Sequence, residues 1–312
     1  MNASSKIRTM RNQQLQRLKQ VFRGKILMDE PLSEHTYFRI GGPADFYLYP
    51  KNLEDLSAVV DFSQREKIPR FVIGNGSNLL VSDDGLRGVV IDLSETFTHI
   101  RCKGALVTVG AGVPLENLLR YCTERGLCGL ESLVGIPGQV GGGIFLNAGA
   151  FDGEISDPLR SLRLLDRFGT LEKRQRENIT VGYRTTDLPS DGIIVEAQFL
   201  LSEGNPKEME AVQRARMKER REKQPLSLPS AGSVFKRPPG DYAGRLIEEV
   251  GCKGLRVGDA MVSKKHANFI VNCHLASAQD VLRLIDEVKE RVLHRFDVEL
   301  ELEINLIGFS ER

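Results

Sequence analysis

Residues 135–150 read GIPGQVGGGIFLNAGA, and this stretch decides how the surrounding chain is interpreted. Six of its residues are glycine, and most of the others are apolar. Glycine lets another group approach the backbone closely, whereas a flexible linker carries serine and other polar residues. The stretch therefore favours a packed backbone beside a bound cofactor over a linker. It lacks the Gly-Lys-Ser/Thr sequence of a P-loop, which excludes that class of nucleotide site.

The segments on either side predict an α+β protein. Before the glycine stretch, apolar residues predict strand, helix and strand between Asp45 and Gly74, then a helix from Pro114 to Arg125. After it, residues 161–202 contain several strand-like runs and no long helix. Because this β-rich region replaces the alternation of strands and helices, we expect an α+β domain rather than a doubly wound sheet.

The length of 312 residues corresponds to about two domains of roughly 150 residues each. Asn205-Pro206 opens a strongly charged helix that ends before Pro225, and we place the domain boundary there. The charged residues 214–223 are expected to form a solvated helix face. The predicted ranges are a polar, fraying extension over 1–24, a first domain over 25–204 with subdomains of about 25–90 and 91–204, and a C-terminal domain over 205–312.

Two local patterns stand out in the C-terminal domain. Ser277 with Asp280 forms the N-terminal capping signal of a helix. Further on, residues 298–306 alternate between apolar side chains and Glu or Asn, which predicts a strand with one face buried. Glu299, Glu301 and Glu303 lie on the polar face of this strand; we expect Glu299 and Glu301 to be solvated, and the strand pattern alone leaves the role of Glu303 open.

The composition excludes several classes of protein. Hydrophobic residues make up 41% of the chain and charged residues 27%, which is typical of a folded, water-soluble protein. The net charge of +1 argues against a nucleic-acid binder, and no window approaches the roughly 18 apolar residues of a membrane span. The five cysteines form no CxxC pair and the histidines show no ligand spacing, so we expect no metal site, no disulfide framework and a reducing cytoplasm.

Three further motifs are ambiguous when taken one at a time. GNGSNL at 74–79 follows a strand and has the backbone freedom to cradle a phosphate, but a tight turn between strands is the simpler interpretation. Gly182-Tyr183-Arg184 can be an ordinary surface arginine beside a tyrosine. Ser233 lacks the G-x-S-x-G frame of a hydrolase nucleophile and can be a turn residue.

Taken together and in this order, the motifs resemble those of the UDP-N-acetylenolpyruvoylglucosamine reductase family. They extend over residues 35–308, nearly the whole chain. The motifs are HTYFRIGG at 35–42, the loop at 74–80, the glycine stretch at 135–150, GYR at 182–184, AGSVFK at 231–236, VGDA at 257–260, HANF at 266–269 and Leu302-Glu303.

The resemblance implies a two-subdomain FAD-binding fold of the vanillyl-alcohol-oxidase type, followed by an α+β substrate-binding domain. It implies non-covalent FAD, with NADPH as the reductant, and a bacterial enzyme that makes UDP-N-acetylmuramate for peptidoglycan. The residues expected to contact FAD are Arg39, Gly74, Asn75, Gly76, Ser77, Asn78, Gly138, Gly142, Asn147 and Gly149. The loop at 74–78 would cradle the pyrophosphate, and the glycine stretch would line the flavin.

The resemblance also places the three catalytic positions of the family on Arg184, Ser233 and Glu303. Arg184 would hold the substrate carboxylate, whose charge grows as an enolate forms. Ser233 would donate the proton, with Lys236 as a candidate for polarising its hydroxyl. Glu303 would help to protonate or stabilise the enolic intermediate, provided that burial favours its protonated form. The expected substrate contacts are Tyr183, Lys223, Lys236, Arg237 and His266.

The chain departs from the family pattern at two places. Arg237 follows Lys236 where many members have asparagine, so the asparagine contact to substrate is replaced or lost. The region between Gly182 and Asn205 is too short for the tyrosine-bearing insertion that covers the substrate in one subclass. The chain thus resembles the shorter subclass, and the sequence does not identify the residue that covers the substrate.

Two other functions remain open at the level of sequence. An FAD oxidase of the same fold would pass electrons mainly to oxygen, and a nucleotide-binding regulatory module would purify without colour. The expected partners are a UDP-sugar and NADPH, with no nucleic acid and no membrane. The sequence leaves open the oligomeric state, with a monomer favoured, and the preference between NADPH and NADH.

Overall fold

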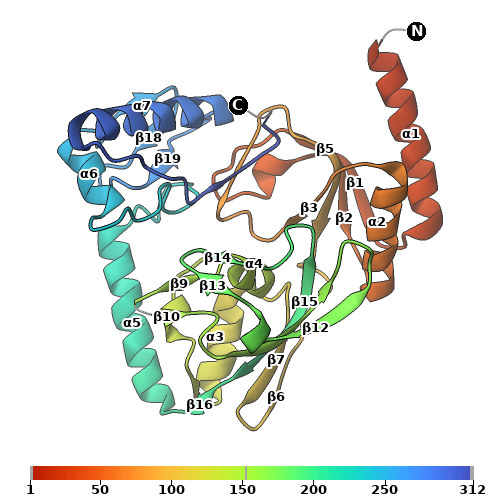
Figure 1. The fold of residues 1–312 in the computed structure, drawn as a ribbon, viewed down its shortest axis with the longest axis horizontal. Coiled ribbons are helices and arrows are strands. Elements are labelled where there is room, and N and C mark those ends of the chain that lie inside the picture. Colours follow the sequence, from red (N-terminus) through yellow and green to blue (C-terminus); the bar gives the residue numbers. More distant parts are fainter. Residues whose placement is uncertain (1–2, 152, 310–312) are drawn as a thin grey trace. The chain divides into compact units, whose positions relative to one another are not determined.

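The structure is a computed structural model that describes residues 3–151 and 153–309 (Figure 1). The chain packs as two compact units, each assembled from separate stretches of sequence. The first unit comprises Met1–Glu30, Ala44–Gly74 and Arg87–Gln213, and the second comprises Pro31–Pro43, Asn75–Leu86 and Arg214–Arg312. The predicted division at residue 205 treats each domain as one continuous range. It therefore misses that Pro31–Pro43 and Asn75–Leu86, which we call the two excursions of the chain, belong to the second unit.

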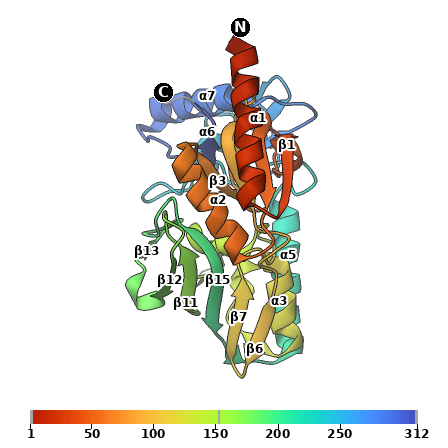
Figure 2. The same cartoon turned by 90° about the vertical axis from the view of Figure 1, so that its right-hand side faces the viewer.

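The N-terminal segment forms helix α1 (Ala3–Val21), where the sequence predicted a polar, fraying extension. Leu18 and Phe22 are buried, and α1 packs along α2 (Leu53–Glu66) in both views (Figures 1 and 2). Side chains four residues apart share one side of a helix, so two apolar residues are enough to fix this face. The expectation was wrong because it counted the basic residues of the segment and overlooked this short apolar stripe.

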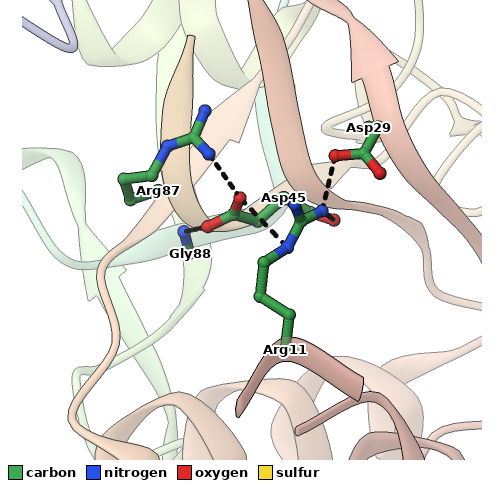
Figure 3. A network of polar contacts seen from close by, with 5 residues as sticks. All are labelled: Arg11, Asp29, Asp45, Arg87 and Gly88. Carbon is green, nitrogen blue, oxygen red and sulfur yellow. Dashed lines mark hydrogen bonds and ion pairs between the residues drawn. The ribbon is translucent and has the colours of Figure 1, made fainter. Parts of the chain in front are cut away.

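A network of charges joins α1 to the sheet beneath it (Figure 3). Arg11 donates through Nη2 to Asp29 Oδ1 (2.6 Å), and its Nε lies 3.4 Å from Asp45 Oδ1. The buried carboxylate of Asp45 also accepts from Arg87 Nη1 (2.8 Å) and from the backbone N–H of Gly88 (3.0 Å). Two arginines and one backbone N–H, from two parts of the chain, therefore converge on two neighbouring carboxylates.

The sheet under α1 and α2 has four strands in the order β1-β2-β5-β3. Its strands are β1 (Lys25–Pro31), β2 (Pro43–Tyr49), β5 (Leu86–Asp92) and β3 (Arg70–Ile73). The predicted strand, helix and strand between Asp45 and Gly74 correspond to β2, α2 and β3, and β3 runs parallel to β5. Asn52 caps α2 by accepting from the N–H of Asp55 (2.9 Å), and the helix ends at Lys67 in the left-handed conformation.

The second sheet of the first unit is antiparallel, with strand order β12-β11-β15-β7-β6 (Figure 2). Its strands are β6 (Ile100–Lys103), β7 (Leu106–Gly110), β11 (Leu159–Leu165), β12 (Leu171–Gln175) and β15 (Ile193–Leu200). Helix α4 (Val140–Phe145) packs on β15 and β7. Helix α3 (Leu115–Glu124) follows β7 and buries Leu115, Leu118, Leu119 and Cys122, whereas Tyr121, which we expected on the same buried side, is only half-buried.

The second unit is built around α7 (Ala278–Phe296) and a sheet of β17 (Arg256–Val257), β18 (Ala260–Val262) and β19 (Ile270–Asn272). Its core also contains Phe38, Ile40 and Leu80 from the two excursions of the chain. The predicted capping box of α7 is confirmed, because Ser277 accepts from Asp280 N and Asp280 accepts from Ser277 N (both 3.0 Å). Asp83 adds a second cap by accepting from Ala278 N (2.8 Å).

The last apolar-polar segment forms a much shorter strand than its alternation predicts. Only β20 (Asn305–Ile307) is regular, and it pairs in parallel with β4 (Leu79–Val81). Leu300 and Ile304 are buried, as the alternation predicts, whereas Leu306 is 38% exposed. The alternation therefore identifies the buried face up to residue 304 and fails beyond it.

The remaining elements are short, apart from two helices. Helix α5 (Pro206–Lys223) has the predicted bounds and a single buried residue, Met209, so it is largely solvated as expected. Helix α6 (Ala243–Glu249) belongs to the second unit. The short elements are η1 (Leu32–Glu34), β8 (Leu127–Cys128), η2 (Glu131–Leu133), β9 (Gly149–Ala150), β10 (Gly153–Glu154), η3 (Arg176–Asn178), β13 (Val181–Gly182), β14 (Thr185–Thr186) and β16 (Ser202–Glu203).

Candidate active site

The glycine stretch forms a short helix, α4, and the turns on either side of it. Gly138 has a φ of +153°, and its carbonyl accepts from the N–H of Leu115 (2.9 Å). Gly142 lies in the first turn of α4, and a Cβ atom added there would meet no described atom within 4 Å. The packing of the protein therefore does not require glycine at 142, and the missing side chain leaves open space beside the helix.

Asn147 follows α4 and is fully buried, with a φ of +44°. Its Nδ2 donates to Glu154 Oε2 (2.6 Å) and to the carbonyl of Gly182 (3.0 Å). Its Oδ1 is buried and has no hydrogen-bond partner among the described residues. A buried amide oxygen without a donor is destabilising by about 1–3 kcal/mol, so a bound group with an N–H would satisfy it.

Arg184 lies at the turn of the β13–β14 hairpin, in the left-handed conformation with a φ of +58°. Its Nη2 donates to the carbonyl of Gly149 (2.7 Å), and its guanidinium lies 5.1 Å from the centre of the Tyr183 ring. Thr186 anchors the hairpin to the end of α4 by donating from Oγ1 to Phe145 O (2.9 Å). The arginine is thus held by the glycine stretch itself.

The loop at 74–78 joins β3 to β4, so it is a turn between strands. A Cβ atom on Gly76 would lie 2.2 Å from the carbonyl oxygen of His35, and its φ is +59°. Glycine at 76 is therefore required by the fold alone. At the end of the loop, Asn78 donates from Nδ2 to the carbonyl of Glu303 (3.0 Å). Arg39, in the motif at 35–42, is exposed and has a φ of +55°.

Ser233 lies on an extended segment between two others in the second unit. Ser233 is bridged to Phe269 on one side, and Phe235 is bridged to Leu302 on the other. The carbonyl of Val234 accepts from the backbone N–H of Glu303 (2.8 Å). The structure therefore brings two of the predicted catalytic residues onto adjacent segments. Arg184 belongs to the first unit.

Asn268 holds the Ser233 segment in place. Its Oδ1 accepts from the N–H of Phe235 (3.0 Å), and its Nδ2 donates to the carbonyl of the same residue (2.8 Å). The side chain is buried, and its amide pairs with the N–H and the C=O of Phe235 as the backbone of a neighbouring strand would. Asn268 lies in the HANF motif, and its role was not predicted; the signal for one is a polar residue between Ala267 and Phe269, both of which are buried.

His266 lies two residues before Asn268 and packs its ring against that of Phe269, with 4.9 Å between ring centres. Its Nδ1 accepts from the N–H of Asn268 (3.2 Å), which assigns the ring proton of the neutral form to Nε2. Burial lowers the pKa of His266, and the positive charge of Lys253 lowers it further. His266 is therefore held as a neutral side chain.

Three predicted substrate-binding residues have basic side chains with partners inside the second unit. Lys223 donates to Glu219 Oε1 (2.7 Å), and this bond raises the pKa of Lys223. Lys236 donates from Nζ to Glu301 Oε2 (3.2 Å), a partner that the sequence did not indicate. The Arg237 guanidinium lies 4.1 Å from the centre of the Tyr242 ring, which is 60% exposed.

The predicted cofactor residues fall into two groups. Gly74, Gly138, Gly142, Asn147 and Gly149 belong to the first unit, and Arg39 with Asn75 to Asn78 belongs to the second. Glycine at 149 has a reason within the fold, because a Cβ atom there would lie 2.5 Å from the carbonyl oxygen of Gly153. The open space at Gly142 and the unsatisfied Oδ1 of Asn147 are the two features that fit a bound flavin ring. Glu154, which shares a hydrogen bond with Asn147, was missed by sequence reasoning.

Comparison with protein-family models defines the class. Residues 44–174 match the model described as an FAD binding domain, and residues 224–307 match the model described as the C-terminal domain of UDP-N-acetylenolpyruvoylglucosamine reductase. The chain is therefore an FAD-dependent oxidoreductase, with an FAD-binding fold of the vanillyl-alcohol-oxidase type followed by a separate C-terminal domain. The predicted fold class and cofactor are confirmed.

Relatives match nearly the whole chain. A UDP-N-acetylenolpyruvoylglucosamine reductase of Lachnoclostridium phytofermentans is 43% identical over 305 residues, covering 96% of this chain and 98% of the relative. One of Symbiobacterium thermophilum is 44% identical over 298 residues, with 95% and 97% covered. The crystal structure of the Thermus caldophilus reductase superposes with a TM-score of 0.80 at 39% identity, covering 92% of this chain and 99% of that one. The chain belongs to the UDP-N-acetylenolpyruvoylglucosamine reductase family.

Proposed function

We propose that the protein reduces the enolpyruvyl double bond of UDP-N-acetylglucosamine-enolpyruvate to give UDP-N-acetylmuramate, with NADPH as reductant, in peptidoglycan precursor synthesis. The observation that carries the proposal is the 43% identity, over 96% of the chain, to a relative whose name states this reduction. FAD, when bound, supplies the hydride. The remaining tasks are to hold the substrate carboxylate and to deliver a proton, and both fall to side chains of this chain.

Arg184 suits the first task. Its guanidinium is permanently charged and planar, so it can bind a carboxylate through two parallel hydrogen bonds. The bond from Nη2 to Gly149 O and the anchored hairpin hold this group before substrate arrives. Because the charge on the carboxylate grows as the enolate forms, a fixed cation stabilises the transition state more than the ground state.

Ser233 and Glu303 suit the second task. Ser233 would donate the proton to the carbanion-like carbon, and Glu303, on the adjacent segment, would assist or replenish that proton. Hydrogen bonds that fix the relative position of the two segments support this assignment. The backbone N–H of Glu303 donates to the carbonyl of Val234, and the Asn268 side chain makes two hydrogen bonds to the backbone of Phe235. A positioned proton donor accelerates such a step by about 100-fold or more.

The substrate contacts are proposed at exposed or half-buried residues around these groups. They are Tyr183, Lys223, Lys236, Arg237 and His266. The exposed Tyr242 ring, with the Arg237 guanidinium over it, supports Arg237 as the replacement for the family asparagine. No helix in the described part of the chain is long and apolar enough to cross a membrane. The reaction consumes NADPH and a nucleotide sugar, both cytoplasmic compounds, so we place the enzyme in the cytoplasm.

One anaerobic absorbance experiment tests the proposal. The purified protein should be yellow, and acid precipitation should release FAD into the supernatant. NADPH should bleach the flavin absorbance, and the UDP-enolpyruvyl sugar should restore it in the absence of oxygen. An oxidase of the same fold would recover its colour only when oxygen is admitted, and a regulatory nucleotide-binding module would be colourless. Either result would refute the reductase assignment.

A further inference from the structure

Two hairpins of the first unit are joined by a ring of hydrogen bonds, and the proposed function gives this ring no role. Glu154 lies on the β9–β10 hairpin, and Arg184 lies at the turn of the β13–β14 hairpin. Asn147 connects the two, because its Nδ2 donates to Glu154 Oε2 (2.6 Å) and to Gly182 O (3.0 Å). The ring closes at Gly149, which pairs with Glu154 in the hairpin and accepts from Arg184 Nη2 (2.7 Å).

The contacts of Asn147 allow its amide only one orientation. Both of its N–H groups point at acceptors, one a carboxylate and the other a carbonyl. A flipped amide would place Oδ1 against those two oxygens, in a fully buried site where water cannot screen the repulsion. Oδ1 is therefore directed away from Glu154, and it is the atom that lacks a partner among the described residues.

Glu154 is the strongest constraint on this orientation. A hydrogen bond to a carboxylate is shorter and stronger than one to a neutral acceptor, in agreement with 2.6 Å against 3.0 Å. The backbone N–H of Glu154 is itself fixed, because it donates to Asp157 Oδ2 (2.7 Å). Removal of the carboxylate leaves the carbonyl of Gly182 as the one acceptor that still favours this amide orientation, so the orientation is held less firmly.

We propose that Glu154 is a positioning residue for both the cofactor and the substrate carboxylate. It sets the Asn147 amide so that Oδ1 accepts a hydrogen bond from an N–H of the isoalloxazine ring. Through Gly182 it also holds the hairpin that presents Arg184. Glu154 touches neither the cofactor nor the substrate. The inference rests on the proposed function for its substrate part, whereas its cofactor part requires only FAD.

The test compares Glu154→Ala and Glu154→Gln with Glu177→Gln, which removes a surface carboxylate of the same unit that pairs with the exposed Arg160. FAD is titrated into the apoproteins, and the flavin spectrum and the rate of flavin reoxidation by substrate are recorded. We expect Glu154→Ala to weaken FAD binding about tenfold and slow reoxidation about tenfold or more. Glu154→Gln, which keeps a neutral acceptor, should lie between Glu154→Ala and wild type, and Glu177→Gln should equal wild type.

A double-mutant cycle shows whether Glu154 acts through Asn147. In an Asn147→Ala background, Glu154→Ala should weaken FAD binding no further, because the amide that it orients is gone. Additive losses, or a Glu154→Ala variant equal to Glu177→Gln in both FAD affinity and spectrum, would overturn the proposal. So would an apoprotein melting temperature that falls in parallel with FAD affinity, because that indicates a purely structural role. Failure of the proposed function would give a different result. In that case the flavin of the wild-type protein, once reduced by NADPH, would not be reoxidised by the UDP-sugar.

Discussion

The carbonyl of Val234 accepts a hydrogen bond from the backbone N–H of Glu303 at 2.8 Å, so the segment that carries Ser233 lies directly beside the one that carries Glu303. The two residues are 70 positions apart in sequence, and their segments are joined again where Phe235 is bridged to Leu302. A proton donor and a carboxylate on adjacent extended segments keep a fixed separation, and the predictions for this site depend on that rigidity.

Ser233→Ala should separate the two half-reactions. The serine hydroxyl is needed only when the substrate carbon is protonated, so flavin reduction by NADPH should remain near wild type. Reoxidation by substrate should slow by about 100-fold or more, with a smaller change in substrate affinity. Ser233→Cys, which retains an ionisable proton, should recover part of the loss. Stopped-flow absorbance measures each half-reaction, and equal slowing of both would contradict the proton-donor role.

Gly142→Val should remove the cofactor without removing the fold. The Cβ atom at 142 points into open space, so the apoprotein should melt within about 2 °C of wild type, while FAD binding weakens by tenfold or more, about 1.4 kcal/mol. Gly143→Val is the matched contrast, because a Cβ there lies 3.2 Å from Ile155 Cδ1 and should destabilise the apoprotein itself. Full flavin occupancy in Gly142→Val would show that the glycine stretch is only a packed turn.

Asp45→Ala should destabilise the first unit by about 3 kcal/mol or more. The substitution leaves Arg11, Arg87 and the N–H of Gly88 without their shared acceptor in a largely buried site. Asp61→Ala removes an exposed helical ion pair to Arg65 and should change stability by less than about 1 kcal/mol. Urea unfolding of both variants measures the difference. Equal effects would mean that the network of Figure 3 contributes no more than surface ion pairs do.

Protonation of His266 should lower the free energy of unfolding of the second unit at mildly acidic pH. Its pKa is lowered in the folded state by burial and by Lys253, so the unfolded chain binds more protons as the pH falls through the ordinary histidine value of 6.5. The free energy of unfolding should therefore fall as the pH is lowered below about 6.5 and continue to fall until the folded-state pKa is reached. His266→Gln should flatten this dependence.

The parts of the fold that sequence predicted are those set by neighbouring residues. The capping box at Ser277 and Asp280, the bounds of α5 and the buried side of α3 each depend on contacts within a few positions. The packing of α1 was missed because it depends on α2, more than thirty residues away. Leu306 was predicted to be buried because alternation cannot show where a neighbouring segment ends.

The candidate site divides in the same way. The glycine stretch and the Ser233 segment could be located from residue type and order alone. The ring through Glu154 could not, because nothing near Glu154 in sequence shows that its carboxylate meets Asn147. The pairing of Lys236 with Glu301 was not predicted for the same reason, because Glu301 is adjacent only after the two segments pair.

The parallel pairing of β4 with β20 determines when part of the second unit can complete its folding during translation. Residues 79–81 leave the ribosome long before residues 305–307, yet each strand is the partner of the other. The stretches 31–43 and 75–86 therefore lack their final packing until residues 305–307 have been translated. During that interval their apolar residues, including Phe38, Ile40 and Leu80, are exposed to chaperones and to other nascent chains. Loss of residues 305–307 would leave β4 without this partner strand.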